Sequence, residues 1–378
     1  MQLSMIRKSL FALLVLCCTS GVFAQNNAAV VFLQIEPDAR FSGMGNAGSA
    51  LADNSSAVFW NPAGLASQKN TELSLTHSNW LPNLSSDLFY EYLTGKYHIE
   101  GLGTFGAHVT FLNLGESERR DESNNLIDTF RSYDAAAGVS FGFPVNERLS
   151  VGTGARIIYS NLDSGGGSVG TQKTQAGISA GVDLGLLYKA RPLNLGGIKT
   201  SLSAGFNLAN MGPTIQYSDK GQSDPIPTNI RLGVASRFDI DNYNSITLVG
   251  DATKLLVHSE KNADTGNFEA DPFYKAIFSS WKPLTVNIAP QGQPEVFKTL
   301  SIANQMTWAA GMEYWYRKFF AIRAGYFYEH PDNGNRNFLT LGAGIRQSII
   351  GVDFSYVISL QENGANADTP RFSIILNL

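Results

Sequence analysis

The chain has 378 residues, of which 43% are hydrophobic and only 16% are charged, whereas soluble domains carry about 25% charged residues. This apolar content excludes intrinsic disorder, and the formal net charge of -4 gives no electrostatic support for nucleic-acid binding. A bundle of membrane helices is also excluded, because each helix needs about 20 consecutive apolar residues and the one long apolar run covers residues 10–18.

Residues 1–24 are predicted to be a secretory signal peptide. Arg7 and Lys8 form its basic start, and the apolar run and a small-residue cleavage site follow. Both cysteines of the chain, Cys17 and Cys18, lie in this segment. The mature protein is therefore expected to contain no disulfide and no cysteine metal site.

Residues 25–70 are predicted to form a separate N-terminal segment, because they show no regular alternation of polar and apolar residues. They are rich in Gly, Ala and Ser, and Pro37 and Pro62 interrupt them, which is typical of loops with short helices. Residues 43–48 match G-x-G-x-x-G, but no strand precedes them and the acid Asp53 follows too early for a dinucleotide site. We interpret these glycines as positions where the backbone packs tightly.

From residue 71 to residue 378, apolar and polar residues alternate, as in β-strands whose two faces differ. One face of each segment is aliphatic, while the other carries Gly, Ser and a few charges, the pattern of outer-membrane barrels. The charged positions Arg156, Asp183, Arg231 and Asp353 are expected in the lumen. The alternation predicts fourteen strands, which begin near residues 71, 87, 103, 132, 149, 174, 198, 227, 245, 305, 319, 337, 350 and 370.

The connections between these predicted strands alternate strictly between short and long. Residues 100–101 and 317–318 are examples of the short connections, whereas residues 161–173 and 258–304 form long ones. A soluble β-sandwich would show similar strands, but short periplasmic turns and long external loops are typical of bacterial outer-membrane barrels. The sequence therefore predicts an all-β fold, a fourteen-stranded antiparallel transmembrane barrel over residues 71–378.

This barrel prediction also orients the chain. If both termini are periplasmic, the long connections face the cell exterior. A barrel of fourteen strands leaves a lumen that its own side chains do not fill. Residues 25–70 are therefore expected to form a plug inside it.

The longest connection contains a predicted amphipathic helix. Asp271 and Pro272 are expected to be its N-cap and first residue, and Pro283 is expected to end it. One face of this helix carries a stripe of mostly aromatic residues, namely Phe273, Tyr274, Ile277, Phe278 and Trp281. Two interpretations remain open. The stripe packs on the barrel rim or in the lipid interface, or it docks a partner at the cell surface.

No pattern of catalytic or metal-binding residues is present. The five histidines form no H-E-x-x-H motif and no i, i+4 pair, so neither a metal nor another cofactor is expected. His77 beside Ser78 and His108 beside Thr110 remain formal base–hydroxyl pairs, although adjacent strand residues point to opposite faces. The charged residues 119–122 are interpreted as part of a solvated external loop. We do not expect the chain to be an enzyme.

Two groups of motifs carry a family resemblance. The N-terminal group comprises residues 32–40, 43–45 and 60–63, and the C-terminal group comprises residues 323–329, 334–336, 340–344 and 353–356. Both groups resemble the PorV/PorQ family of outer-membrane proteins, which are relatives of the FadL fatty-acid channels. The N-terminal family motif is carried by Pro37, Asp38, Arg40, Gly43, Met44, Gly45, Asn61 and Pro62.

The resemblance implies a FadL-type barrel of fourteen strands in the outer membrane, with an N-terminal plug. It further implies a role in the type IX secretion system of the Bacteroidetes. The expected partners are the secretion pore protein, cargo with C-terminal signal domains, a surface-attachment complex containing a sortase-like protease, and outer-membrane lipid. The alternative function is a FadL-like channel for hydrophobic small molecules, which would need a continuous apolar path past the plug.

Overall fold

The computed structural model describes residues 28–378 except for 84, 121–122, 164–167, 170–171, 174, 219–222, 262–267, 288–295 and 362–368. The predicted signal peptide, residues 1–24, and the acids Asp121 and Glu122 lie outside the described residues.

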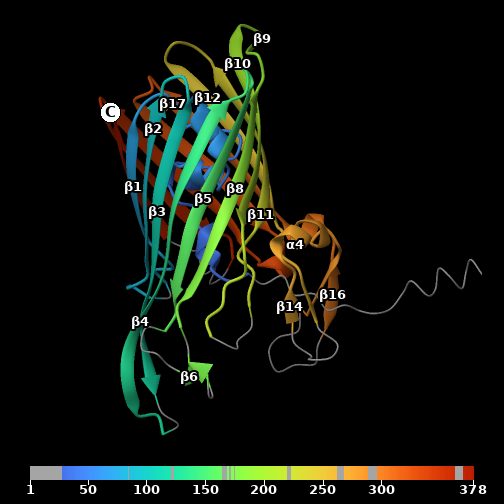
Figure 1. Ribbon diagram of the computed structural model, residues 1–378. Coiled ribbons are helices and arrows are strands. Elements are labelled where there is room, and N and C mark those ends of the chain that lie inside the picture. The colour runs from blue at the N-terminus through green and yellow to red at the C-terminus, as the bar shows by residue number, and fades with distance from the viewer. Residues whose placement is uncertain are drawn as a thin grey trace, which may run out of the picture.

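A closed barrel of fourteen antiparallel strands dominates the described part of the chain and confirms the predicted fold (Figure 1). Each strand pairs with its neighbour in chain order, and the last strand pairs with the first. The strands are β1 (Glu72–Asn79), β2 (Phe89–Ile99), β3 (Gly103–Arg120), β4 (Leu126–Pro144), β5 (Leu149–Asn161), β8 (Gly177–Lys189), β10 (Ile198–Met211), β11 (Asn229–Asp239), β12 (Asn244–Leu255), β17 (Met306–Tyr316), β18 (Phe320–Glu329), β19 (Asn337–Gln347), β20 (Ile350–Ser359) and β21 (Thr369–Asn377).

The alternation along each strand separates a lipid-facing side from a lumen side. In β8 the aliphatic residues Ile178, Val182 and Leu184 are exposed on the outside of the barrel, whereas Asp183 is buried inside it. An exposed aliphatic side chain is stabilised by lipid rather than by a protein core, and alternation of this kind is typical of membrane barrels.

One prediction about the connections is wrong. Residues 115–120 and 126–130, expected as parts of a loop, belong to the paired strands β3 and β4, so β4 begins at Leu126 rather than near residue 132. The pairing register shifts between Asn113 and Glu116, next to Gly115 with φ 81°. A glycine bulge lets the ladder bend and continue, so strand pairing persists into residues 116–120, which are all polar.

The two ends of the barrel differ in their connections. At the short-turn end, tight connections such as residues 317–319 lie near the C-terminus (Figure 1). At the opposite, long-loop end lie the hairpin of β3 and β4 and the small strands β6 (Ser168–Val169) and β7 (Gln172–Lys173). The short strand β9 (Leu193–Leu195) extends β10 at the short-turn end.

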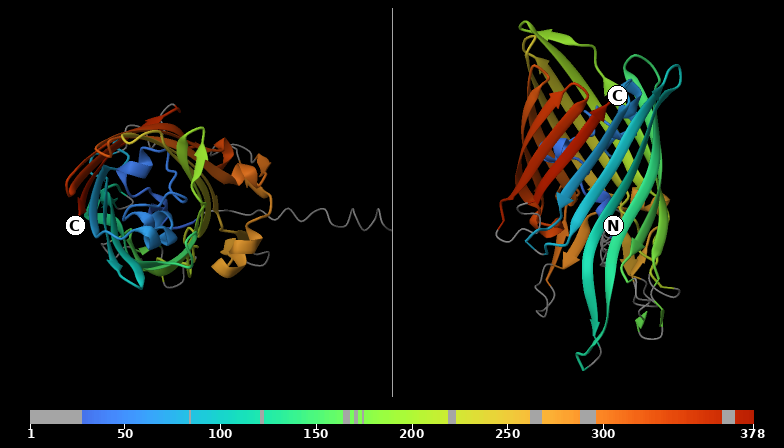
Figure 2. Two further views of the ribbon diagram at one scale, coloured as in Figure 1. Left: turned by 90° about the horizontal axis from the view of Figure 1, so that it is seen from above. Right: turned by 90° about the vertical axis from the view of Figure 1, so that its left-hand side faces the viewer.

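The longest connection, residues 256–305, is called the insertion below. It lies outside the barrel wall (Figure 2). Its elements are β13 (Ser259–Lys261), β14 (Phe268–Ala270), α4 (Phe273–Ser279), β15 (Leu284–Asn287), β16 (Phe297–Leu300) and η3 (Ala303–Gln305).

The N-terminal segment, residues 28–70, lies inside the barrel, where Figure 2 shows it within the ring of strands. It consists of short helical turns joined by loops, namely η1 (Val31–Gln34), α2 (Ala39–Ser42), α3 (Ala57–Trp60) and η2 (Pro62–Ser67). Its apolar side chains form the main buried cluster together with inward residues of the wall such as Tyr90, Tyr92 and Ile158. No helix in the described residues is long and apolar enough to cross a membrane.

Candidate functional site

A chain of buried ion pairs joins the N-terminal segment to the barrel wall. Arg40 donates two hydrogen bonds to Glu313 of β17, both of 2.8 Å, and a third to Asp53. Glu313 also accepts from Arg323 of β18 at 2.7 Å, and Arg323 reaches Asp353 of β20 at 2.8 Å. Breaking one member of such a buried network leaves its partners as uncompensated charges.

A second attachment involves β12, the strand next to β17, and β8. Asp251 of β12 accepts hydrogen bonds from the backbone N–H of Gly48 at 2.9 Å and from the N–H and hydroxyl of Ser49 at 2.8 and 2.7 Å. Asn61 donates to the carbonyl oxygens of Ser49 and of Leu186 in β8, both at 2.9 Å. Wall side chains thus satisfy backbone groups that the short helical turns leave unpaired.

The glycines at 43–48 pack against glycines of the wall, as the sequence predicts. A Cβ on Gly325 would lie 2.0 Å from the nitrogen of Gly45, and one on Gly311 would lie 2.2 Å from the carbonyl oxygen of Met44. Gly45 also has a φ of 68°, a backbone conformation that favours glycine. The backbone of the segment therefore lies directly on the backbone of β17 and β18.

The residues of the N-terminal family motif are all buried in this segment, namely Pro37, Asp38, Arg40, Gly43, Met44, Gly45, Asn61 and Pro62. Asp38 is the N-cap of α2 and accepts from the N–H of Phe41 at 2.9 Å. Each of these residues therefore contributes to packing or anchoring. The lumen charges expected from the sequence are also buried, and Arg156 forms an ion pair with Asp183.

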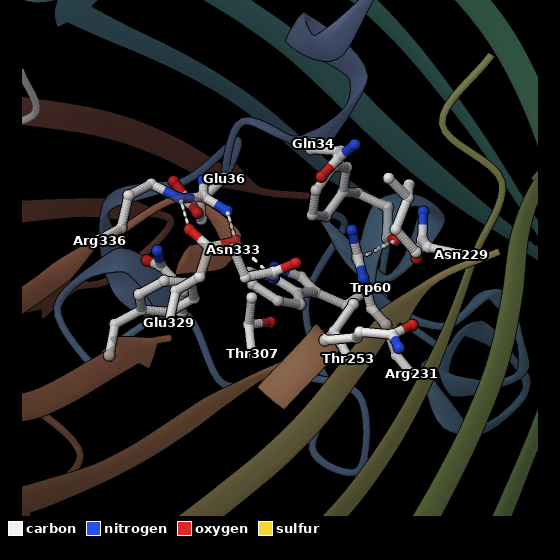
Figure 3. Close-up of a pocket in the computed structure, with 15 residues that line it drawn as sticks. Gln34, Glu36, Trp60, Asn229, Arg231, Thr253, Thr307, Glu329, Asn333 and Arg336 are labelled. Atoms are coloured by element: carbon white, nitrogen blue, oxygen red, sulfur yellow. Dashed lines mark hydrogen bonds and ion pairs between the residues drawn. The ribbon is translucent and has the colours of Figure 1, made fainter. Parts of the chain in front are cut away.

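A polar cavity of about 130 Å³ opens between the segment and the wall at the long-loop end (Figure 3). Arg231, which is 6% exposed, lies with its guanidinium carbon 4.4 Å from the ring centre of Phe59 and donates to the carbonyl of Phe59 at 3.1 Å. In the described residues Arg231 forms no ion pair within 4.0 Å. Opposite it, Glu329 binds Arg336 at 2.7 Å beside Glu36 (Figure 3). A cavity lined by these charged side chains is suited to a polar ligand rather than to a hydrocarbon.

A second cavity, of about 340 Å³, lies at the short-turn end. It is lined by Arg40 and Asp53 of the segment and by strand residues such as Arg237 and Arg346. The two cavities share no lining residue, and the N-terminal segment lies between them. Neither is an apolar passage.

The predicted helix in the insertion exists, but its ends differ from the prediction. Pro272 is the N-cap rather than the first helical residue, and Asp271 makes no capping bond. α4 ends at Ser279, so Trp281 follows the helix and donates its indole N–H to the carbonyl of Ile277 at 2.9 Å. Without a capping bond the helix begins only after the proline, and the turn at Ser280 closes it.

The aromatic stripe points away from the protein. Tyr274 is 65% exposed, Phe278 is 78% exposed, and Trp281 is exposed as well, whereas Phe273 and Ile277 are half-buried. The opposite side of the helix, at Ala276 and Ser280, is buried. The insertion is therefore anchored through small residues and presents its aromatic rings outward.

Asp271 instead holds the base of the insertion together. It accepts hydrogen bonds from Lys275 Nζ at 2.6 Å and Ser279 Oγ at 2.7 Å, and lies 3.1 Å from His258 Nδ1. Burial by itself raises the pKa of Asp271, but these hydrogen bonds and the Lys275 charge outweigh it and lower that pKa. The same contact raises the pKa of Lys275.

Arg119 and Arg120, expected in a solvated loop, belong to β3 instead. Arg119 forms ion pairs with Asp128 and with Asp163 of the next connection, and Arg131 binds Glu116. These pairs join neighbouring connections and stiffen the long-loop end. In the part of the chain that the structure describes, no group of three His, Cys, Asp or Glu side chains could hold a metal ion.

Comparison with known proteins identifies the family. A family model described as "Type IX secretion system protein PorV" matches residues 24–262, more than half of the chain. The chain belongs to the PorV family. No curated protein sequence matches the chain.

Solved structures show the same architecture. The Pseudomonas putida toluene transporter TodX is 15% identical, with 91% of this chain and 98% of that chain covered and a TM-score of 0.50. The Ralstonia pickettii toluene transporter TbuX is 14% identical over 92% and 98% of the two chains, with a TM-score of 0.48. A Pseudomonas aeruginosa FadL homologue is 12% identical over 90% and 97%, with a TM-score of 0.42. At these identities the likeness concerns the fold alone.

The PorV match and the closed barrel together make this chain an outer-membrane β-barrel protein. The sequence analysis named Arg156 and Asp183, which form a pair, but missed the partners of Arg40 and Asp353. Glu313, which accepts from Arg40, and Arg323, which donates to Glu313 and Asp353, lie in strands whose alternation looks ordinary. The alternation of each strand places both residues on the lumen side, and this was the one feature of the sequence that pointed to them.

Proposed function

We propose that this PorV-family barrel binds the secretion pore of the type IX system and cargo with C-terminal signal domains. It would then deliver the cargo to a surface-attachment complex with a sortase-like protease. In this proposal the long-loop end faces the cell exterior. The observation that carries it is the fixed N-terminal segment, since a barrel closed by buried anchors is better suited to binding proteins than to conducting solutes.

Three kinds of contact support a static plug. The Arg40 network bridges three strands, Asp251 of β12 holds the backbone of Gly48 and Ser49, and the glycine contacts leave no space for displacement. Releasing the segment would expose several buried charges and backbone groups at once, at about 3–5 kcal/mol for each broken buried ion pair. Thermal fluctuation does not supply that energy readily.

The long-loop end supports the binding role. It combines the β3–β4 hairpin, stiffened by Arg119, with the charged cavity around Arg231. These elements come from distant parts of the chain, and the hairpin extends beyond the rest of the barrel at this end (Figure 1). A surface formed by such elements suits recognition of a folded protein domain.

The alternative is uptake of hydrophobic small molecules, because TodX and TbuX are named as toluene transporters. An apolar hollow of about 560 Å³ does lie at β1–β3, lined by outward residues such as Leu73, Leu93 and Phe105. The two cavities beside the plug are lined by charged residues instead. This contrast favours the secretion role.

We also propose that the protein is not an enzyme. A catalytic base must lie within hydrogen-bond distance of the hydroxyl that it activates. Among the described residues, one histidine meets this condition, namely His98, whose Nδ1 lies 2.9 Å from Thr104 Oγ1. Thr104 donates its own proton to the carbonyl of Gln68 at 2.8 Å, so His98 cannot act as its base. His108 is buried and stacks on Tyr92, with ring centres 5.9 Å apart.

Deletion of the gene followed by proteomics of the medium and the cell surface tests the main proposal. Loss of proteins with C-terminal signal domains from the surface supports it. Normal secretion combined with reduced uptake of toluene or long-chain fatty acids would overturn it in favour of the channel.

A disulfide between the plug and the wall distinguishes the secretion proposal from the channel alternative. The double variant Ser49→Cys, Asp251→Cys puts one thiol on each partner of the contact in which the side-chain oxygens now lie 2.7 Å apart. The secretion proposal expects full secretion in the oxidised and in the reduced state. A channel whose plug must move would lose uptake on oxidation and recover it on reduction, so the reduced protein is the matched control.

A further inference from the structure

The insertion covers part of the outer wall of the barrel. In β12 the odd-numbered residues, such as Asp251 and Thr253, face the lumen, so the even-numbered Lys254 faces outward. The side chain of Lys254 is nevertheless 0% exposed. Its ammonium donates to Gln305 Oε1 at 2.8 Å and lies 5.6 Å from the ring centre of Trp281. The insertion thus folds back over a position that otherwise faces the membrane.

The position of Lys254 along the strands places this contact at the membrane boundary. Lys254 pairs with Met306, the first residue of β17, and Asn244 pairs with Tyr316, the last. Ten residue steps span about 33 Å along a strand, and a tilt of about 40° reduces this to about 25 Å, the height of the lipid-facing band of such barrels. Lys254 and the insertion therefore lie at one edge of that band.

The outward residues of β17 agree with this placement. Trp308, two residues from Met306, and Tyr316 at the far end are both exposed on the outside of the wall. Aromatic residues on the outer surface of a barrel gather in girdles at the two membrane interfaces. Trp308 marks the interface at the long-loop end, next to the insertion.

Within the insertion, α4 lies nearest to this interface. Figure 1 shows α4 beside the barrel wall, whereas β14 and β16 lie further toward the long-loop end. Tyr274 and Phe278 of α4 are largely exposed, and Trp281 and Lys282, which follow the helix, are exposed as well. Aromatic rings with a lysine beside them are typical of segments that lie in the headgroup region of a bilayer.

We propose that α4 is an interfacial anchor, whose Tyr274, Phe278 and Trp281 insert into the lipid leaflet at the long-loop end. The leaflet covers the apolar face that no part of the described protein covers. The anchor fixes the insertion against the wall and orients the external surface relative to the membrane plane. It is independent of the secretion role.

Spin labelling of the protein purified from the outer membrane, after removal of the predicted signal peptide, tests this anchor. The two cysteines of the chain lie in the predicted signal peptide, so Phe278→Cys and, separately, Tyr274→Cys provide single attachment sites for a nitroxide. The purified protein is reconstituted in vesicles of phosphatidylethanolamine and phosphatidylglycerol. Relaxation of the label by oxygen, which concentrates in lipid, is compared with relaxation by a water-soluble nickel chelate.

Two reference positions calibrate the measurement. Leu184→Cys places a label on the exposed lipid face of β8, and Glu147→Cys places one in an exposed turn at the short-turn end. The proposal expects both α4 labels to resemble the Leu184 reference. Labels that resemble the Glu147 reference in vesicles would overturn it. The labels could also be accessible to the nickel chelate in pure vesicles and become inaccessible to it only in membranes that contain the partner proteins. This result would show that the face docks a protein instead.

Discussion

Two segments depart from the barrel pattern, and they are held in opposite ways. The N-terminal segment is enclosed on all sides and anchored by charges, with Arg40 and Asp251 as its main contacts. The insertion lies outside the wall, contacts it through Lys254, is held together by Asp271, and leaves Tyr274, Phe278 and Trp281 exposed.

The difference reflects the two environments of a barrel. Inside, the wall offers polar side chains and small residues, so a segment is stabilised by buried hydrogen bonds and close backbone contact. Outside, the wall is apolar and faces lipid, so a covering segment must neutralise its own polar groups and turn apolar ones outward. The N-terminal segment is therefore held by buried polar contacts, whereas the insertion turns apolar side chains away from the wall.

The largest expected effect comes from the charges inside. Glu313→Gln removes the carboxylate shared by Arg40 and Arg323, so we expect the free energy of unfolding to fall by about 3–5 kcal/mol. The measurement is the urea and thermal unfolding of the barrel in lipid. Glu116→Gln is the control, because its ion pair with Arg131 is exposed and is worth about 0–1 kcal/mol. Equal losses in the two variants would contradict a charge-anchored segment.

Close backbone contact inside the barrel should be nearly as sensitive. Gly325→Ala places a methyl group 2.0 Å from the nitrogen of Gly45, and we expect overpacking to cost roughly 1–3 kcal/mol. Gly250→Ala serves as the matched variant, since its nearest neighbour would be 3.7 Å away. Unfolding temperatures of the pair measure the difference. If both variants unfold alike, the segment does not rest on β18 as described.

The insertion should respond locally rather than globally. Lys254→Ala leaves the Oε1 of Gln305 without its donor, which costs about 1–3 kcal/mol for a buried group. Because the barrel itself is unaffected, we expect faster proteolysis of residues 256–305 at an unchanged unfolding temperature. Lys199→Ala, at an exposed position of β10, should leave the cleavage rate as it is. A lower unfolding temperature for Lys254→Ala would show that the insertion and the barrel unfold together.

The smallest effect is the pH dependence of the insertion. The lowered pKa of Asp271 means that its contacts stabilise the folded insertion above the ordinary Asp pKa of 3.8. This stabilisation is lost as the pH falls through the lowered value. Since Lys275 is largely exposed, we expect less than about 1 kcal/mol. Hydrogen exchange of residues 273–279 between pH 6 and pH 3 should show the loss, and Asp271→Asn should remove its pH dependence.

Much of the architecture was predictable from the sequence. Strict alternation places every other residue on the same face of a strand, and alternating connection lengths distinguish a barrel from a sandwich. Thirteen of the fourteen predicted strand starts lie within three residues of the observed ones. The outer part of the β3–β4 hairpin was missed because residues 116–125 are all polar, so hydrophobic periodicity carries no signal there.

The sequence by itself determined the barrel, the lumen side of each strand and the aromatic stripe of the insertion, since these depend on local periodicity. Only the tertiary structure decided which lumen residues meet. Glu313 contacts Arg40 across 273 positions of the chain, and no local pattern pairs residues at such a distance. The same holds for Lys254, which the alternation assigns to lipid and which lies instead beneath the insertion, because a long connection can fold back over any part of the rim.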